Sequence, residues 1–504
     1  MPPPLQPSDA TLAEPASGLS VAEQAGERAV KNTLVRSGGE VVGKVASFVL
    51  FAALARALGQ SELGVFVLAL AFVQVATMPV GLGLDRYMLR RIAGDRPALG
   101  GYLYNVLGLK LALSVPAAVA TAVLVNVLGY DAHTRLVVYV LTLGVLLELL
   151  ARTLLGVFEA FERGGLLAVS LIVQRVLAAG LGLAALAAGL GVVTIALTYT
   201  TAAAAALVLT GLLFARRIGF PRPSLDRSGW GGLARSSLPF AVQDVFGVLL
   251  FRIDTVILSL MATEAAVGRY GAAYRLFEAT LLFTWALTGS FVAMFVYLDE
   301  RSEPTLRAAF QRSIKVALAV LTPCAVALGV LAEPVCRVLF GGEFAAAAAP
   351  LRALAPVIVL IGIVSLSSSL IVSRGRPTLM VGLTAAMASL NIVLNVALIP
   401  SLADTGAALA MLATEAAFAA MVLTVGARLV GGLEWTPMVV SPLLAGGLMA
   451  VPIVLLASWP LAAAGAGVAI YVAAFVALER AVSPLDLEFM VAMAKRRLPS
   501  RAGA

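Results

Sequence analysis

Charge is scarce in this chain of 504 residues. Asp, Glu, Lys and Arg together make up 13% of it and hydrophobic residues 61%, whereas soluble domains carry roughly 25% charged residues. The mean hydropathy of +0.98 places most of the chain in lipid rather than in water. The composition therefore predicts an integral membrane protein and argues against a soluble domain.

Cysteine and histidine are almost absent. Cys324 and Cys336 are the only cysteines, and His133 is the only histidine. Two cysteines form neither a disulfide framework nor a metal cluster, and one histidine cannot form a proton-relay cluster. We therefore expect no metal and no cofactor. The formal net charge of +8 is modest. In a membrane protein, an excess of basic residues usually marks the cytoplasmic loops, so we expect no nucleic-acid partner.

Long apolar runs are abundant, and most are near or above the roughly 20 residues that cross a bilayer as a helix. We count fourteen of them. They lie at 30–58, 62–85, 100–128, 135–158, 165–189, 191–215, 234–261, 267–297, 305–331, 346–373, 377–399, 404–428, 438–457 and 460–479. This pattern predicts an all-α integral membrane protein.

Arginine is concentrated in every second connection between these runs, as in the stretches 84–96 and 215–235. The other connections are short and nearly free of basic residues. Because basic loops stay on the cytoplasmic side, this alternation predicts a multi-pass protein with both termini in the cytoplasm.

A faint internal repeat relates the two halves of the chain. "QSELGVF" follows the first run and "EAAVGRY" follows the seventh, so that Gly64 aligns with Gly268 and Phe66 with Tyr270. Six spans per unit give parallel repeats about an axis along the membrane normal. We predict two pseudo-symmetric six-helix lobes followed by a C-terminal helix pair.

The predicted divisions follow from this repeat and from local composition. They are a disordered cytoplasmic tail at 1–29, an N-terminal lobe at 30–217, a cytoplasmic linker at 218–233, a C-terminal lobe at 234–430, a helix pair at 431–479 and an amphipathic basic cytoplasmic tail at 480–504.

The first span contains "GGEVVGK", which has the spacing of a phosphate-binding P-loop. Val45 follows Lys44, however, where a P-loop needs Ser or Thr to bind magnesium, and no strand precedes it. Helical spacing instead places Arg36, Glu40 and Lys44 on one face. Because charges inside a span are costly unless paired or hydrated, we interpret this face as the lining of a central cavity. A structural ladder that only neutralises itself is the alternative.

Gly39, Gly43 and Ser47 form a stripe of small residues about 60° around the same helix, where another group can approach closely. Other predicted spans carry charges too, and spans 1 and 7, the first of each lobe, have the densest polar faces. This coincidence predicts one central site between the lobes. Among these further charges within spans, those that support a cavity are Lys110, Glu148, Arg152, Arg175, Asp244, Arg252, Asp254, Arg275, Glu278, Lys315 and Glu415. Glu148 and Arg152 are equally well explained as a structural pair, and Lys110 could extend toward an interface.

The seventh span carries the clearest family resemblance. "LPFAVQDVFGVLLFRIDTVILSLMATEAAVGRYGAAYRLFE" resembles the polysaccharide-export flippases of the MOP superfamily, which are related to the lipid II flippase and to MATE transporters. "LGQSELGVFVLALAFVQ", "VLFGGEFAAAAAPLRALAP" and "NIVLNVALIPSLADTGAALAMLATE" are similar to that family as well. The resemblance covers about residues 30–480. It implies two six-helix bundles around a central cavity, alternating access, and a glycan substrate carried on polyprenyl diphosphate in the bacterial inner membrane.

A diphosphate headgroup that crosses a region of low dielectric needs cationic partners, and Arg and Lys bind phosphate oxygens by charge-assisted hydrogen bonds. The candidate substrate-binding residues are Arg36, Lys44, Arg175, Arg252 and Arg275. The candidate partners of these cations are Glu40, Asp244, Asp254 and Glu278, any of which could instead bind a coupling proton or sodium ion.

Other functions remain to be weighed. A MATE-like antiporter of drugs or organic cations is the alternative, although it would favour a cavity rich in acids and aromatics. A membrane enzyme is disfavoured because the loops are too short for a catalytic domain, and an inert scaffold would not need so many buried charges. We therefore expect a monomeric transporter, not an enzyme, whose partners are a lipid-linked glycan and membrane lipids.

Overall fold

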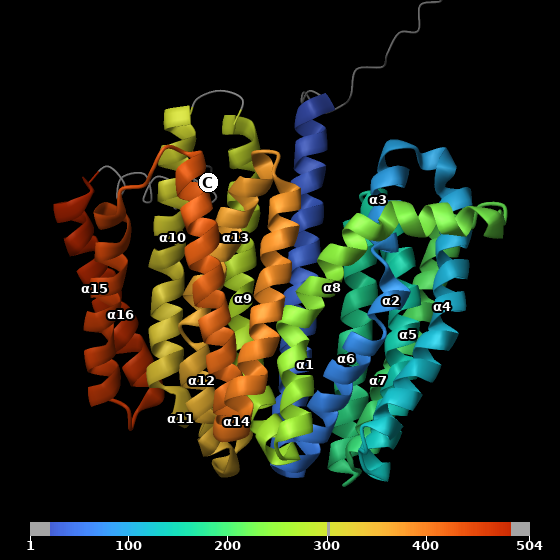
Figure 1. Cartoon of the computed structure of the whole chain (residues 1–504), viewed down its shortest axis with the longest axis horizontal. Helices are drawn as coiled ribbons and strands as arrows, with labels where there is room; N and C mark the ends of the chain where they lie inside the picture. Colours follow the sequence, from blue (N-terminus) through green and yellow to red (C-terminus); the bar gives the residue numbers. More distant parts are fainter. Residues whose placement is uncertain (1–20, 300–302, 485–504) are drawn as a thin grey trace, which may run out of the picture.

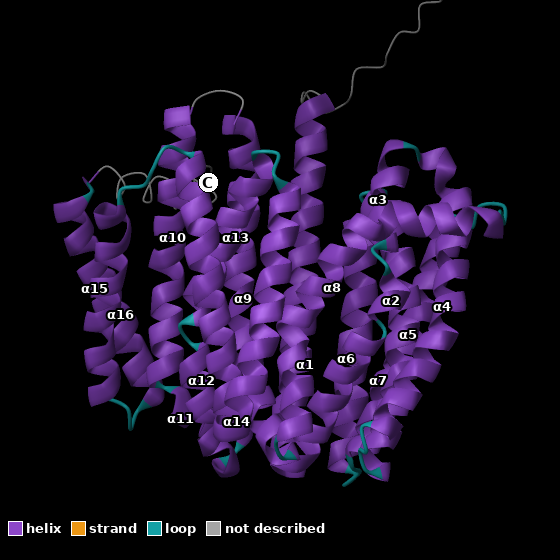
Figure 2. Cartoon of the chain, viewed as in Figure 1, coloured by secondary structure: helices purple, strands orange, loops and turns teal. Residues whose placement is uncertain are grey.

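The computed structural model describes residues 21–299 and 303–484, and every regular element in these ranges is a helix (Figure 2). Ten of the described segments are long and apolar enough to cross a membrane. The predicted C-terminal tail lies almost entirely outside the described residues, as do residues 1–20 of the predicted N-terminal tail.

The N-terminal bundle consists of helices α1 to α7 (Figure 1). They are α1 (Val21–Ala76), α2 (Met78–Gly81), α3 (Leu84–Gly94), α4 (Leu99–Val127), α5 (Ala132–Ala160), α6 (Gly164–Ala187) and α7 (Val192–Arg217), with a short 3-10 turn, η1 (Arg96–Ala98), before α4. α1 begins within the stretch predicted as a tail, and it is two helices joined by a kink at Gly59, whose φ of 78° suits glycine.

The C-terminal bundle and the final helix pair comprise the remaining helices. They are α8 (Trp230–Met261), α9 (Glu264–Asp299), α10 (Glu303–Val330), α11 (Ala332–Phe340), α12 (Ala348–Leu354), α13 (Val357–Ser373), α14 (Pro377–Leu429), α15 (Trp435–Leu455) and α16 (Pro460–Val482), with 3-10 turns η2 (Arg227–Gly229) and η3 (Gly342–Ala347). α14 is kinked at Ala403. α1 and α14 each consist of two helices joined at a kink, and α8 and α9 also have spanning length. The described helices are therefore compatible with the fourteen predicted passages.

The predicted span 62–85 is longer than the helix that forms. The second half of α1 ends at Ala76, and Gly83 adopts a left-handed conformation with φ 63°. A Cβ at Gly83 would lie 2.5 Å from the backbone nitrogen of Ala241 in α8. The chain therefore breaks here so that its backbone can pass close to α8 at Phe240 and Ala241.

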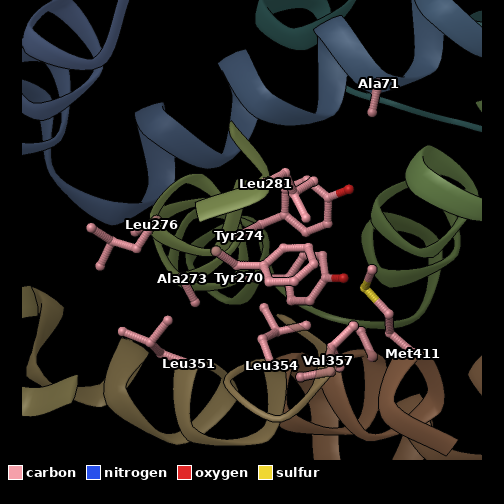
Figure 3. Packing of buried hydrophobic residues seen from close by; sticks show 14 of the residues in the cluster. Ala71, Tyr270, Ala273, Tyr274, Leu276, Leu281, Leu351, Leu354, Val357 and Met411 are labelled. Atoms are coloured by element: carbon pink, nitrogen blue, oxygen red, sulfur yellow. The ribbon is translucent and has the colours of Figure 1, made fainter. Parts of the chain in front are cut away.

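α9 is central to the packed core. Its Tyr270 and Tyr274 are buried, and Figure 3 shows them with Leu354 of α12 and Met411 of α14 on one side and the second half of α1, marked by Ala71, on the other. The core cluster joins residues of both bundles. α9 is thus the element through which the two bundles contact each other most directly.

The aligned glycines of the internal repeat meet in space. A Cβ added at Gly64 would lie 2.0 Å from the carbonyl oxygen of Glu264, and one added at Gly268 would lie 2.0 Å from that of Gln60. Each glycine thus contacts the residue four positions before the other one. We call this end of the molecule, at the bottom of Figure 1, the crossing end.

Polar contacts reinforce the crossing end. The Arg56 side chain donates from Nε to the Leu339 carbonyl at 2.9 Å. Arg269 pairs with Asp404 at 2.8 Å and donates to Gln60 at 3.2 Å. Because Arg56 and Gln60 belong to the first bundle and their partners to the second, these bonds hold the two bundles together at this end.

The opposite end exposes arginines of α3, α7 and the start of α8, and we call it the basic end. These exposed residues are Arg90, Arg91, Arg216, Arg217 and Arg235. The chain between α7 and α8 is held there by Asn105 of α4. Asn105 Oδ1 accepts from the backbone N–H of Asp226 at 2.9 Å and from the indole of Trp230 at 3.0 Å. The connection between the bundles is therefore docked on α4.

The final pair, α15 and α16, lies at one edge of the molecule beside α10 (Figure 1). Tyr471 donates its hydroxyl to the Ala319 carbonyl at 2.8 Å. Lys315 of α10 forms an ion pair with Glu479 of α16, and both side chains are almost completely buried. A hydrogen bond and an ion pair, both between α16 and α10, thus attach the final helix pair to the C-terminal bundle.

Candidate functional site

The stripe of small residues on α1 receives α6. A Cβ at Gly39 would lie 2.9 Å from the Ala168 Cβ, and one at Gly43 would lie 2.6 Å from the Arg175 Cδ. The Arg175 side chain therefore runs directly across Gly43. Its charge interacts with those of Lys44 and, on a third helix, Glu148. The close approach expected at this stripe is thus that of Arg175 and its helix.

Arg252 and Arg275 both contact one carboxylate. Arg252 Nη2 lies 3.4 Å from Oε1 of Glu278, and Arg275 Nη1 lies 3.1 Å from Oε2. Arg252 also lies over the ring of Tyr274, and Arg275 over that of Phe51 in α1, at 5.6 and 5.5 Å from the ring centroids. The three charged side chains are 28 to 30% exposed, so they border accessible space rather than a packed core.

Lys44 completes the group of cations. Its Nζ lies 4.0 Å from the ring centroid of Trp285 on α9. The charges of Glu278, Glu40 and Arg175 all act on it. Lys44, Arg175, Arg252 and Arg275 are therefore brought together with Glu40 and Glu278, and we call these six residues the central cluster. The side chain of Arg36, the fifth predicted cation, lies outside the described residues.

Two of the predicted carboxylates lie elsewhere. Asp244 pairs with Arg86 of α3 at 3.1 Å, nearer the basic end, and this ion pair links α8 to the N-terminal bundle. Asp254 is completely buried inside the C-terminal bundle. It accepts hydrogen bonds from the Tyr270 hydroxyl and, at 2.6 Å, from the backbone N–H of Thr255. Asp254 is therefore not a direct partner of Arg252, whose partner is Glu278.

A second buried polar group occupies α14. Asn395 donates to Asn391 Oδ1 at 2.9 Å, and Asn391 donates to the Thr414 hydroxyl at 3.3 Å. Glu415, the residue after Thr414, is also buried. One of its carboxylate oxygens has no hydrogen-bond partner among the described residues. The charge of Glu415 acts on Tyr274 of α9. The C-terminal bundle thus contains the buried carboxylates of Asp254 and Glu415.

Other charges within spans are satisfied locally. Lys110 is completely buried, at 2.7 Å from both oxygens of Asp85 and 2.9 Å from the Thr153 hydroxyl. Glu148 accepts from Arg152 at 2.8 Å and from the Tyr199 hydroxyl at 2.6 Å. These residues therefore act as structural groups. In the part of the chain that the structure describes, no three His, Cys, Asp or Glu side chains stand together as a metal site.

Trp285 and Phe51 were not among the predicted site residues. Trp285 follows Glu278 by seven residues on α9, a spacing that places both on one helical face. That spacing was a usable signal. No sequence signal indicated that Phe51 lies under Arg275, because this contact depends on how α1 packs against α9.

Comparison with known proteins agrees with this architecture. Residues 29–293, just over half of the chain, match the family described as polysaccharide biosynthesis protein. A relative in Haloferax volcanii, named "Probable low-salt glycan biosynthesis flippase Agl15", is 27% identical over 362 residues. The match covers 71% of this chain and 74% of that protein.

Solved structures share the fold. The lipid II flippase MurJ in an inward closed conformation has a TM-score of 0.74 at 12% identity, over 89% of this chain and 99% of that one. An inward-facing multidrug resistance MATE family transporter has a TM-score of 0.61 at 18% identity, over 77% and 94%. The predicted two-lobed all-α membrane fold is thereby confirmed. The chain belongs to the polysaccharide biosynthesis protein family and has the multi-pass helical fold of the MOP superfamily.

Proposed function

We propose that the protein is a flippase, a transporter rather than an enzyme, that moves a lipid-linked oligosaccharide from the cytoplasmic to the outer leaflet. The glycan is carried on polyprenyl diphosphate. The protein works as a monomer in the bacterial inner membrane, with both termini and the basic end in the cytoplasm. Family membership and the flippase name of the Haloferax relative support the class of substrate.

The central cluster is the observation that carries this proposal. Its four cations face two carboxylates, Glu40 and Glu278, so two positive charges remain. A diphosphate supplies matching negative charge. Arg252 and Arg275 already converge on the Glu278 carboxylate, and phosphate oxygens accept the same forked, charge-assisted hydrogen bonds.

The crossing end supports a mechanism of alternating access. There the two bundles are held together by the Gly64–Gly268 contact and by the bonds of Arg56 and Arg269. A bulky glycan cannot pass while these contacts exist. Release on the outer side requires them to part while the bundles close elsewhere.

Asp254 is the carboxylate that we assign to ion coupling. An ionised carboxylate without a cationic partner is costly in a buried site. Among the described residues, the hydrogen-bond donors to Asp254 are the neutral groups of Tyr270 and Thr255. A proton or a sodium ion would offset that cost. The other candidate carboxylates have cations nearby. Glu278 and Asp244 pair with arginines, and the charge of Glu40 acts on Lys44.

The test is transport of a lipid-linked glycan in proteoliposomes, normalised to folded protein. Arg252→Ala should weaken apparent affinity about tenfold or more, because one charge-assisted contact is lost. Arg252→Lys should restore only part of it, since an ammonium lacks the planar fork. Unchanged transport by a combined Arg36→Ala, Lys44→Ala and Arg252→Ala variant would contradict the proposal. A gain in drug resistance on overexpression would favour the antiporter instead.

A further inference from the structure

Trp285 is a large aromatic side chain on the face of α9 that carries Glu278. It is 51% exposed and lies about 10 Å further along the axis than Glu278. Because α9 runs from the crossing end to the basic end (Figure 1), Trp285 lies on the basic side of the paired arginines. An indole there borders the path that a glycan would take from the basic end.

The ammonium of Lys44 lies over the ring face of this indole. Its Nζ is buried and has no hydrogen-bond partner among the described residues, although an ammonium has three protons to donate. The cation–π contact with Trp285 offsets only part of that loss. A phosphate oxygen would offer Lys44 a stronger, charge-assisted bond. Of the four cations, Lys44 thus loses least when an anion arrives.

We propose that Trp285 is a sugar-binding platform, capped by Lys44 in the empty protein and uncovered when a phosphate draws Lys44 away. The apolar C–H face of a pyranose ring packs on an indole as other apolar groups do. The first sugar of a lipid-linked glycan is bonded to the diphosphate, so it lies beside the phosphates that the arginines hold. This proposal rests on the proposed function and adds to it the subsite for the sugar.

The same movement would loosen a contact between the bundles, because Lys44 belongs to α1 and Trp285 to α9. A diphosphate without a sugar would release Lys44 but leave the indole bare. A glycosylated diphosphate would fill both places. Trp285 therefore distinguishes the loaded carrier lipid from the empty one.

Tryptophan fluorescence tests the capping step. In the full-length protein with Trp230, Trp435 and Trp459 changed to phenylalanine, Trp285 is the only reporter. Addition of inorganic pyrophosphate should increase acrylamide quenching of Trp285. With Lys44→Gln, quenching should be high from the start and should not respond to pyrophosphate. An uncapped Trp285 in the original protein, or an unchanged response in Lys44→Gln, would overturn the proposal.

Binding of two defined lipids tests the platform itself. The probes are farnesyl diphosphate and the same lipid carrying one N-acetylglucosamine. Trp285→Ala should weaken binding of the glycosylated lipid about three- to tenfold and should not weaken binding of farnesyl diphosphate, which no longer has to break the contact of Lys44 with the indole. Trp435→Ala is the matched control, because Trp435 is also 51% exposed but lies on α15, and it should change neither affinity.

The outcomes separate the two proposals. An equal loss for both lipids, or no loss for either, would overturn the role of Trp285 while leaving the flippase function intact. Failure of the unmodified protein to bind either lipid would overturn the proposed function, and the sugar subsite with it.

Discussion

Lys110 shows how a charge within a membrane span can be structural. Its ammonium is enclosed by Asp85, Thr153 and the Leu149 carbonyl. Each proton therefore has an acceptor, and no accessible surface remains for a substrate. The same residue type at Lys44 has no acceptor in the part of the chain that the structure describes, and its ammonium lies over an aromatic ring. Two lysines in two spans thus have different partners, and we expect different roles for them.

Removal of the Lys110 charge should affect stability rather than transport. Lys110→Met leaves the Asp85 carboxylate without its partner, which costs about 3–5 kcal/mol for a buried pair. We expect a clearly lower melting temperature of the purified protein, with transport per folded molecule unchanged.

The double variant Lys110→Met with Asp85→Asn is the control. It should recover part of the lost stability, because it leaves no unpaired charge. Loss of transport by folded Lys110→Met protein would show instead that Lys110 belongs to the transport path.

Sequence could predict which residues are charged but not which charges meet. Helical spacing placed Glu40 and Lys44 on one face, and the structure brings both into the central cluster. The partner of Asp244 lies on α3, and Trp285 lies under Lys44 across the boundary between the bundles. Such pairs depend on how helices far apart in sequence pack, which no local spacing encodes.

At the level of the helices, the crossing of α1 and α9 depends on two glycines. Gly64→Ala would place a methyl group 2.0 Å from the Glu264 carbonyl oxygen, so the helices must separate. We expect the closed crossing end to become less populated. Ser61 and Ala265 line one pocket at this end. When both are changed to cysteine, the disulfide between them should form several-fold more slowly in the Gly64→Ala background than with Gly64 intact.

Gly211→Ala on α7 is the control for this experiment. A Cβ at Gly211 meets nothing within 4 Å, while the gain in helix propensity is the same. An unchanged cross-linking rate in Gly64→Ala would show that the crossing does not depend on close backbone approach.

The start of α5 provides a prediction about pH. The Asp131 side chain accepts hydrogen bonds from the backbone N–H groups of His133 at 2.9 Å and Thr134 at 3.3 Å. Partial burial would raise the pKa of Asp131, but hydrogen bonds from Thr134 and His133 outweigh it and lower the pKa. The ionised cap therefore stabilises the folded protein above the unfolded-state pKa of about 3.9, and this stability is lost as the pH falls through the folded-state value.

Asp131→Ala should therefore destabilise the protein by about 1 kcal/mol at neutral pH. The difference in melting temperature between the variant and the original protein should shrink as the pH falls below 4. A difference that stays constant down to pH 3 would show that the carboxylate charge does not contribute to the cap.

For the whole molecule, orientation in the membrane is the main prediction. We expect Ser224→Cys, in the connection docked on α4, to react with an impermeant maleimide only after the membrane is opened. Ser401→Cys, exposed at the kink of α14, should react in intact cells. The reverse pattern would contradict the assigned topology. Asp404 is a poor reporter because it is nearly buried and paired with Arg269.

The overall architecture was predictable because a bilayer demands apolar helices of fixed length. The fourteen runs and the repeat at Gly64 and Gly268 required no knowledge of packing. The kinks at Gly59 and Ala403 and the break before Gly83 were not predicted, since they depend on how each turn meets its neighbours.

The reciprocal contact of Gly64 and Gly268 is that of an isologous interface, in which residue i touches j and j touches i. Two copies of one half-length chain could form the same contact if each copy contributed one glycine. Fusion of two such copies frees the equivalent positions to diverge. With the alignment that matches these glycines, Glu40 corresponds to Asp244, but Lys44 corresponds to Val248 and Arg252 to Phe48. A symmetric dimer would bear every cation twice, whereas the joined chain carries Lys44 and Arg252 each once, an asymmetry that suits the asymmetric headgroup we propose.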